Sequence, residues 1–305
     1  MLDFVTSLAM TACVALLLTP AISWSATADA PAPDLAFGAY QRGDYSTAMK
    51  EAKKRIAANP KDAAALTLVG QLYLEGAGVA RDLSVAMEWF KRGADAGDGE
   101  AAYLYGAAAL NGAGAPKDRA VARAYLEKAA AQDRPAALHL LGELALENEG
   151  APSDFGRAAD YFKRAAELGN ADSLYALGVL YKTGRGVAKD ERVAADWFKR
   201  AAELDFAPAM VEFAVLQFNG VGVTRDRAAA VQWFRKAAAK GNAVAQNRLA
   251  HILAQGLVLA QGLGVDINLA EAREWRDKSR EAGLNDPSLD YLSNASEPHK
   301  PAESK

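Results

Sequence analysis

The chain has 305 residues, of which 51% are hydrophobic and 24% are charged, so it contains enough apolar material to form a folded core. Its 35 basic and 38 acidic residues give a formal net charge of −3. This near balance provides neither the basic surface that nucleic-acid binding needs nor a polybasic stretch for anionic lipid, so we expect no nucleic-acid or lipid partner.

The first residues differ in composition from everything that follows. An apolar run over residues 4–18 is followed by small residues at 26–28, the pattern that signal peptidase cleaves. We therefore expect residues 1–28 to be a secretory signal peptide, and the mature protein to be periplasmic or secreted without membrane insertion. The run contains no Lys or Arg, however, so an uncleaved inner-membrane anchor at residues 4–20 and a cytoplasmic chain remain alternatives.

Cys13 is the only cysteine, and it lies within this leader. A lipid-modified Cys13 is a weaker alternative, because the apolar run continues beyond it, whereas a lipobox should close that run. The mature chain would contain no disulfide bond. Helix packing alone must then hold it together.

Residues 29–61 precede a regular repeat. Gly43-Asp44-Tyr45, with Ala48 and a terminal Asn59-Pro60, resembles a degenerate tetratricopeptide unit. The resemblance implies a helical hairpin that caps the N-terminal end of the repeats.

From residue 62 onward the pattern Gly-x-Gly-x₃-Asp-x₃-Ala-x₂-(Trp/Tyr) recurs every 36 residues, with a final step of 42. A repeat of this length indicates one supersecondary unit stacked many times, because a single unit cannot bury its own apolar face. The repeated aromatics are Trp89, Tyr125, Tyr161, Trp197, Trp233 and Trp275, and the repeated aspartates are Asp82, Asp118, Asp154, Asp190 and Asp226.

Residues 170–205 illustrate one unit. Apolar residues at helical spacing predict a first helix over residues 172–182, which Gly184 and Gly186 then interrupt. Asp190 can accept backbone N–H bonds at the start of a second, amphipathic helix. Each unit is therefore predicted to be an antiparallel helix pair, which makes the chain all-α.

Small residues recur inside both helices. Glycine in a helix costs about 1 kcal/mol relative to alanine, so its recurrence predicts a position where two helices cross too closely for a side chain. We expect the repeated aromatics to fill the space between neighbouring units. The first-helix glycines are Gly70, Gly106, Gly142 and Gly178, with Ala214 and Ala250 in the last two units, where a looser crossing is expected; the second-helix alanines are Ala86, Ala122, Ala158, Ala194 and Ala230.

These units resemble the Sel1-like repeat, a relative of the tetratricopeptide repeat. The matching residues are Leu177, Gly178 and Tyr181 of the first helix, the linker 184–190, and the second-helix segment that begins at Ala194. The resemblance implies a right-handed α-solenoid. We expect six units at residues 62–97, 98–133, 134–169, 170–205, 206–241 and 242–283, then a C-terminal cap at 284–292 in which Leu289, Tyr291 and Leu292 cover the last unit, and a disordered tail at 293–305.

Two units depart from the pattern. The third has Asn148 where the others have the first linker glycine, so its turn should differ. The sixth contains a tandem duplication over residues 254–265, whose six extra residues should lengthen the first helix or bulge the linker. We favour an origin by replication slippage over a functional role for these residues.

Catalytic motifs are absent from the sequence. It contains no G-x-S-x-G, S-x-x-K, H-E-x-x-H or phosphate-binding loop, so we expect neither an enzyme nor a cofactor. His139, Glu143 and Glu147 share one helical face and could hold a divalent metal ion. A solvated polar stripe is the favoured interpretation, because a metal site needs another firm ligand and a buried second shell, so no metal is predicted.

By the same resemblance, the first helices line the concave face of the solenoid. A surface of Tyr, Leu and Phe with few charges suits an extended peptide or a partner helix. The alternative is that these side chains only pack between neighbouring units. The candidate binding residues are Tyr103, His139, Glu143, Tyr175, Val179, Lys182 and Phe218.

Resemblance to exported Sel1-repeat proteins implies a non-enzymatic scaffold or adaptor in the cell envelope, with a regulatory role in signalling or exopolysaccharide control and with protein partners. One alternative is a structural component of a polysaccharide-export or secretion complex. Another is a β-lactamase-like hydrolase, against which the missing nucleophile motif argues. The sequence identifies neither the partner nor the oligomeric state.

Overall fold

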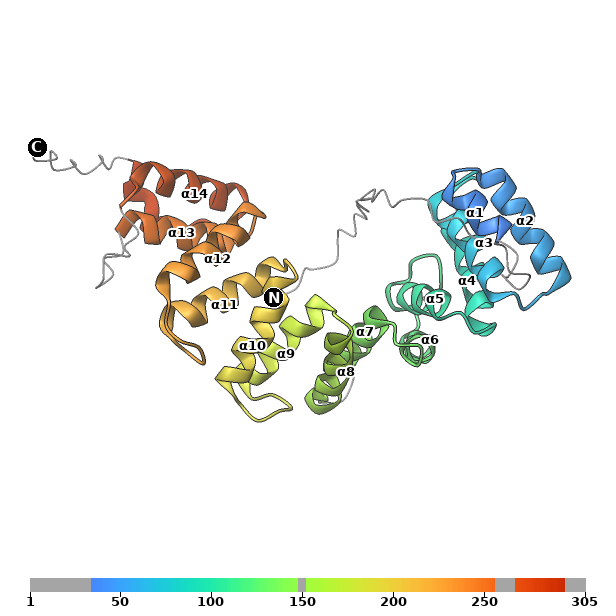
Figure 1. Cartoon of the computed structure of the whole chain (residues 1–305), viewed down its shortest axis with the longest axis horizontal. Coiled ribbons are helices and arrows are strands. Elements are labelled where there is room, and N and C mark those ends of the chain that lie inside the picture. Colours follow the sequence, from blue (N-terminus) through green and yellow to red (C-terminus); the bar gives the residue numbers. More distant parts are fainter. Residues whose placement is uncertain (1–33, 148–151, 256–266, 294–305) are drawn as a thin grey trace, which may run out of the picture.

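The computed structural model describes residues 34–147, 152–255 and 267–293. These residues form fourteen α-helices and one 3-10 helix, with no strand among them, which confirms the predicted all-α class. Consecutive helices pair antiparallel, and the pairs stack along a curved path as a right-handed α-solenoid (Figure 1). None of the helices in these three ranges combines the length and the apolar character that a membrane crossing requires.

The helix bounds follow the repeat closely. The first seven helices are α1 (Leu35–Gln41), α2 (Tyr45–Ala58), α3 (Ala63–Glu75), α4 (Leu83–Asp95), α5 (Gly99–Asn111), α6 (Arg119–Ala130) and α7 (Pro135–Leu146). The remainder are α8 (Phe155–Glu167), α9 (Ala171–Thr183), α10 (Glu191–Glu203), α11 (Ala207–Asn219), α12 (Arg227–Ala239), α13 (Ala243–Gln255), α14 (Leu269–Glu281) and the 3-10 helix η1 (Pro287–Ser293).

Several predictions concern residues outside the described ranges. They are the leader at 1–28, the turn at Asn148, most of the duplication at 254–265 and all but the first residue of the tail at 293–305. The predicted N-terminal hairpin corresponds to α1 and α2, of which α1 has only seven residues. Leu35 and Phe37 of α1 are exposed, so the N-terminal end of the solenoid presents apolar side chains to solvent.

Each second helix begins at the repeated aspartate. The Asp190 carboxylate accepts the backbone N–H groups of Arg192 and Val193 at 2.9 and 3.1 Å. Side-chain acceptance of this kind satisfies donors that the first helical turn leaves without partners. The same N-cap contact is present at Asp82, Asp118, Asp154 and Asp226, and at Asn268 in the last unit.

The first helix of the fourth unit ends on glycine. Gly184 has φ of 72° and returns its N–H to Leu180 O at 2.8 Å, so α9 stops in the left-handed conformation that glycine adopts without strain. The predicted helix over residues 172–182 is thus confirmed, with one further residue at each end.

The helix crossings involve a side chain that the repeat pattern did not single out. The side chain that lies on each first-helix glycine comes from the residue after the repeated aromatic: Phe198 on Gly178, for example, and Leu126 on Gly106. Phe198 is fully buried, whereas Trp197 beside it is only half-buried. The repeated Trp and Tyr rings are partly buried and pack against the core clusters.

The exposed faces of these larger rings are covered by cations. Arg200 lies 4.4 Å from the centre of the Trp197 ring on the same helix, a cation–π contact. The spacing is three residues, so both side chains leave one face of the helix. The same contact joins Trp89 to Arg92, Tyr125 to Lys128, Trp233 to Lys236 and Trp275 to Lys278.

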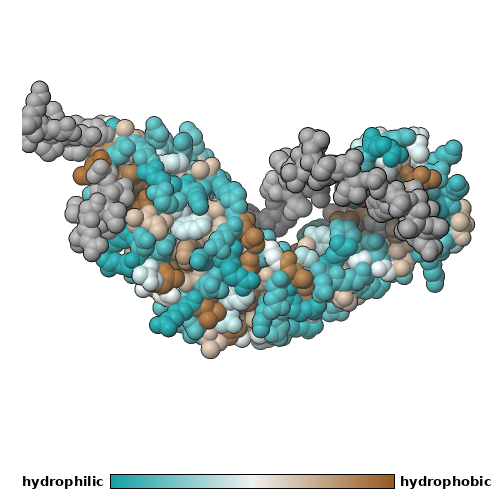
Figure 2. Space-filling model, in the orientation of Figure 1, coloured by the Kyte–Doolittle hydropathy of each residue, from teal (hydrophilic) through white to brown (hydrophobic). Residues whose placement is uncertain are grey.

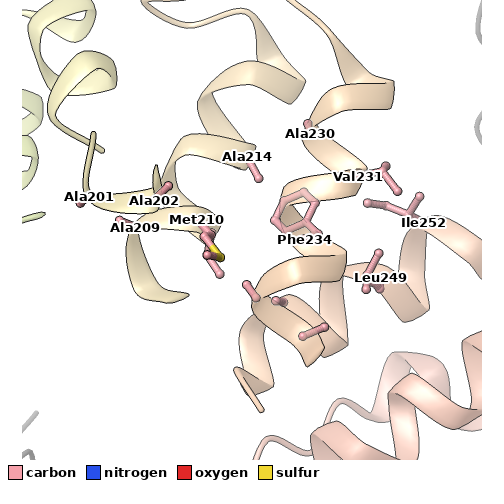
Figure 3. Packing of buried hydrophobic residues seen from close by; sticks show 14 of the residues in the cluster. Ala201, Ala202, Ala209, Met210, Ala214, Ala230, Val231, Phe234, Leu249 and Ile252 are labelled. Carbon is pink, nitrogen blue, oxygen red and sulfur yellow. The ribbon is translucent and has the colours of Figure 1, made fainter. Parts of the chain in front are cut away.

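In the fifth unit alanine takes the glycine position, yet the ring is still buried. Phe234 is 2% exposed and lies between Ala214 of α11 and Ile252 of α13 (Figure 3). A continuous core therefore runs through this part of the solenoid, from the third unit into the sixth. The looser crossing expected at Ala214 stays a prediction.

The last unit is built to receive the C-terminal segment. Arg276 stands at the position of the buried phenylalanine, is 7% exposed, and donates to Ser293 Oγ at 3.0 Å. Leu289 and Leu292 of η1 are both 0% exposed. The expectation that Tyr291 would also cover the last unit is wrong, because its side chain is 52% exposed.

Candidate functional site

A hollow of about 640 Å³ lies between α7 and α9, with the start of α11 at one end; we call it the central groove. Figure 1 shows α5 and α7 on the inner side of the arc and α6 and α8 on the outer side. Figure 2 shows hydrophobic side chains near the middle of the arc, among mostly hydrophilic surface. The groove combines side chains from three successive units, because neighbouring first helices lie side by side in a solenoid.

Tyr175 forms the centre of the groove. Its ring packs against Phe198 and Phe206, with a centroid distance of 5.6 Å in each case. Burial, assisted by the negative charge of Glu212, raises the pKa of the Tyr175 phenol. The hydroxyl therefore stays neutral at physiological pH and can donate a hydrogen bond to a bound segment.

His139 lies on the opposite wall. Its Nδ1 is 2.9 Å from Ser173 Oγ, and its Nε2 is 3.4 Å from Glu143 Oε1. A serine beside an imidazole and a carboxylate resembles the start of a hydrolase site, but Ser173 is 0% exposed. A substrate in the groove could not reach its hydroxyl, so this arrangement orients His139 and joins α7 to α9.

The structure does not gather the three residues considered for a metal ion. Glu147 turns toward Arg119, with Oε2 3.1 Å from Nη1, and leaves His139 with only Glu143. Across the three described ranges, His, Cys, Asp and Glu side chains form no group of three or more suited to a metal ion.

Four of the seven candidate binding residues line the central groove: His139, Glu143, Tyr175 and Val179. Lys182 points away toward α11, where its Nζ is 2.7 Å from Glu212 Oε2. Four of the candidates therefore share one hollow, and Lys182 joins α9 to α11.

The other two candidates lie elsewhere. Tyr103 is half-buried and packs against the core of the second and third units, as in the alternative interpretation, and burial raises its pKa. Phe218 lines a second hollow, of about 230 Å³, together with Val215 and His251. Arg227 lies over the Phe218 ring, with its Cζ 5.2 Å from the ring centre.

The groove also contains residues that are not among the seven candidates, and Phe155, Phe206 and Arg185 are three of them. Phe155 begins α8, Phe206 is the N-cap of α11, and Arg185 lies between the two linker glycines, 5.5 Å from the Phe155 ring. Phe206 did carry a signal. The corresponding N-cap residue is polar in the other five units, namely Asp62, Asp98, Arg134, Asn170 and Asn242.

A second omission concerns His251. No acid lies near it at helical spacing, but Asp286 from the segment before η1 brings its carboxylate Oδ2 to 2.8 Å from His251 Nε2. Asn247 also donates to this carboxylate, at 3.1 Å. The contact fastens the C-terminal segment to α13.

Comparisons with known proteins agree with this architecture. The Sel1 repeat model matches six segments, residues 63–98, 99–133, 135–170, 171–206, 207–242 and 243–284. Each begins one residue after the start of a predicted unit. No curated protein matches the chain significantly.

Two solved structures are similar over most of the chain. One is a protective antigen of uropathogenic Escherichia coli strains with an SLR fold. It shares 30% sequence identity with this chain, the match covers 82% of this chain and 53% of the antigen, and the TM-score is 0.72. The other is a Sel1 repeat protein from Oxalobacter formigenes. It shares 27% sequence identity with this chain, the match covers 80% of this chain and 94% of that protein, and the TM-score is 0.67. This chain spans about half the length of the Escherichia coli antigen. With six matching repeats over most of its length, the chain belongs to the Sel1 repeat family.

Proposed function

We propose that this protein is a regulatory adaptor of the cell envelope that holds a peptide segment or a helix of a partner protein in the central groove. Sel1 repeats in general form non-catalytic scaffolds for protein–protein interaction, and this chain consists largely of them. The observation that carries the proposal is the groove itself, in which Tyr175, Val179 and Phe206 remain half-exposed beside a fully buried core.

The groove chemistry suits a macromolecular segment. Aromatic and aliphatic side chains supply apolar area, which dominates the energy of most recognition surfaces. The groove lies along two neighbouring helices, so a helix or an extended strand of a partner can follow it. Such a segment would bury Tyr175 and Val179 further and exclude water from the apolar wall.

The envelope part of the proposal rests on the leader pattern at residues 1–28. A reporter enzyme that is active only outside the cytoplasm, fused after residue 28, should be active. Replacing the small residues at 26–28 with bulky ones should leave the leader attached and increase the apparent mass. An inactive reporter would place the adaptor inside the cell.

The binding part is tested by crosslinking the full chain in cells and identifying captured proteins by mass spectrometry. Val179→Glu places a charge in the apolar wall and Tyr175→Ala removes its central ring, so each should lose the partners that the native chain captures. Tyr291→Ala is the matched control, because Tyr291 is exposed far from the groove. Both groove variants must retain the native helical circular dichroism; unchanged capture in folded variants would refute the groove as the binding site.

The regulatory part predicts that deletion of the gene changes the activity of the captured partner while the partner complex still assembles. Failure of the complex to assemble would instead indicate a structural role.

A further inference from the structure

The central groove carries opposite charges at its two ends. Asp172 lies in the first turn of α9, the end at which His139 of α7 contacts Ser173, and Glu143 lies one turn further along α7, at the repeat position of Val179. Arg185 lies just past the other end of α9, against the ring of Phe155. The apolar part of the groove, with Tyr175 and Val179, lies between.

These charges are available to a bound segment. Asp172, Glu143 and Arg185 are all exposed, and the side chain of Glu143 is 50% exposed with only His139 in range. Lys182 lies near the same helix end as Arg185, but Glu212 neutralises it at 2.7 Å. The groove is thus acidic at the start of α9 and basic beyond its end.

Comparison among the units shows that the basic end is specific to this groove. Arg185 is the middle residue of a Gly-x-Gly linker, and in the other described linkers of this type that residue is Ala77, Ala113 or Val221. The backbone of the turn therefore does not need an arginine. An alanine at this position is compatible with the same pair of left-handed glycines.

We propose that the groove selects a segment with an apolar centre, a basic residue at one end and an acidic residue at the other, bound in a single direction. The inference rests on the proposed function and adds the chemistry of the partner. Lys or Arg of the segment pairs with Asp172, and its acidic residue pairs with Arg185. Reversing the segment would place like charges together, which disfavours the wrong orientation.

The length of α9 sets the spacing between the two charges. Thirteen residues at 1.5 Å each span about 20 Å. An extended segment covers this distance in about six residues, and a helical one in about thirteen.

The test uses a displayed library of random peptides of about 15 residues, long enough for either conformation, selected on the full chain. Selected peptides should combine an apolar centre with opposite charges at the spacing above. Synthetic copies with blocked termini, in which the two charged residues are exchanged, should bind about three- to tenfold more weakly, as two exposed charge pairs imply.

Two variants sharpen the result. Arg185→Ala, which reproduces the linker residue of the first two units, should reduce the difference between the original and the charge-exchanged peptide to about two- to threefold, because Asp172 still distinguishes the two. Arg185→Glu should shift selection toward peptides that are basic at both ends. Both variants retain the apolar wall, so they should still bind peptides with an apolar centre.

The outcomes separate the two proposals. One outcome is that the peptides compete with one another and that Val179→Glu abolishes their binding, but that the order of their charges makes no difference. That outcome would overturn the directional inference and leave the adaptor function in place. Absence of any peptide whose binding depends on Tyr175 or Val179 would overturn the groove function itself.

Discussion

Gly178 of α9 lies directly against the ring of Phe198 of α10: a Cβ atom added to Gly178 would come within 2.5 Å of Cε1 of that ring. The same arrangement recurs at Gly70 with Phe90 and at Gly142 with Phe162. The repeated glycine thus makes room for one buried phenylalanine, and that contact sets how closely the two helices of a unit approach.

We predict that Gly178→Ala destabilises the protein. The ring of Phe198 is fully buried and cannot turn out of the way, so the added methyl group overpacks the crossing at a cost of about 1–3 kcal/mol. The better helix propensity of alanine offsets about 1 kcal/mol of this at most. Urea denaturation measures the difference.

Gly156→Ala is the control for this substitution. Gly156 lies in the first turn of α8, and its nearest contact for a Cβ atom is Asp154 Oδ1 at 3.7 Å, an ordinary distance. The change should therefore be neutral or slightly stabilising. Equal destabilisation by both alanines would show that the Phe198 contact is not the cause.

Asp190→Ala should lower stability by about 1 kcal/mol, because two N–H groups in the first turn of α10 lose their acceptor. Asp190→Asn should cost much less, since an amide oxygen can accept the same bonds and Asn268 does so naturally at α14. Thermal unfolding of the two variants compares them. If Asp190→Asn lowered stability as much as Asp190→Ala, the charge of Asp190 would matter there and not its hydrogen bonds to the helix terminus.

The ion pair between Arg235 and Glu271 joins the fifth and sixth units and predicts a pH effect. Hydrogen bonds from Arg235, together with one from Trp275, hold the pKa of Glu271 below its ordinary value of 4.5. Because the pKa of Glu271 is lower in the folded than in the unfolded protein, its ionised form stabilises the fold. This stabilisation is complete above the pKa of the unfolded state and is lost as the pH falls through the pKa of the folded state. Acidification below 4.5 should therefore weaken this junction.

Thermal unfolding at pH 7 and about pH 3.5 tests this effect. Glu271→Gln should lower Tm at pH 7 and reduce the further drop on acidification, since its side chain cannot take up a proton in this range. Glu274→Gln, an exposed position on the same helix, should behave as the native chain does. An acid-induced drop of equal size in Glu271→Gln and the native chain would contradict the assignment.

Asp286 should control the attachment of the C-terminal segment. A hydrogen bond from His251, with others from Ser288 and Asn247, holds the pKa of Asp286 well below its usual range, so it stays ionised through ordinary pH. Asp286→Ala should therefore accelerate amide hydrogen exchange at Leu289 and Leu292, measured by mass spectrometry. Tyr291→Ala changes an exposed neighbour and should alter amide exchange little. Unchanged exchange at Leu289 and Leu292 in Asp286→Ala would show that Asp286 does not hold the C-terminal segment in place.

Much of the fold was accessible from the sequence because its signals are local. The repeat period, the glycines after each first helix and the aspartate before each second helix act within a few residues of the chain. They located both ends of α9 and the start of α10 to within one residue. The sequence did not show which of two adjacent large apolar residues, the repeated Trp or Tyr or the residue after it, lies on the glycine of the first helix. Both residues fit the same apolar periodicity of the second helix.

The candidate site was accessible only in part. His139 and Tyr175 share one position of the repeat, and Glu143 and Val179 share another, so the repeat positions found all four. Phe206 and Arg185 depart from that register, and their place in the groove depends on contacts with residues some 30 positions away, Tyr175 and Phe155. Asp286 reaches His251 over a similar separation.

The local pattern of the chain was enough to predict six repeat units behind an N-terminal hairpin, because helix formation, capping and apolar periodicity depend on neighbours three and four residues apart. Which side chains converge on one hollow and which are paired elsewhere, as Lys182 is with Glu212, became visible in the folded structure. The reason is geometric: the angle between successive pairs results from packing across units, and it selects which residues of one unit meet those of the next.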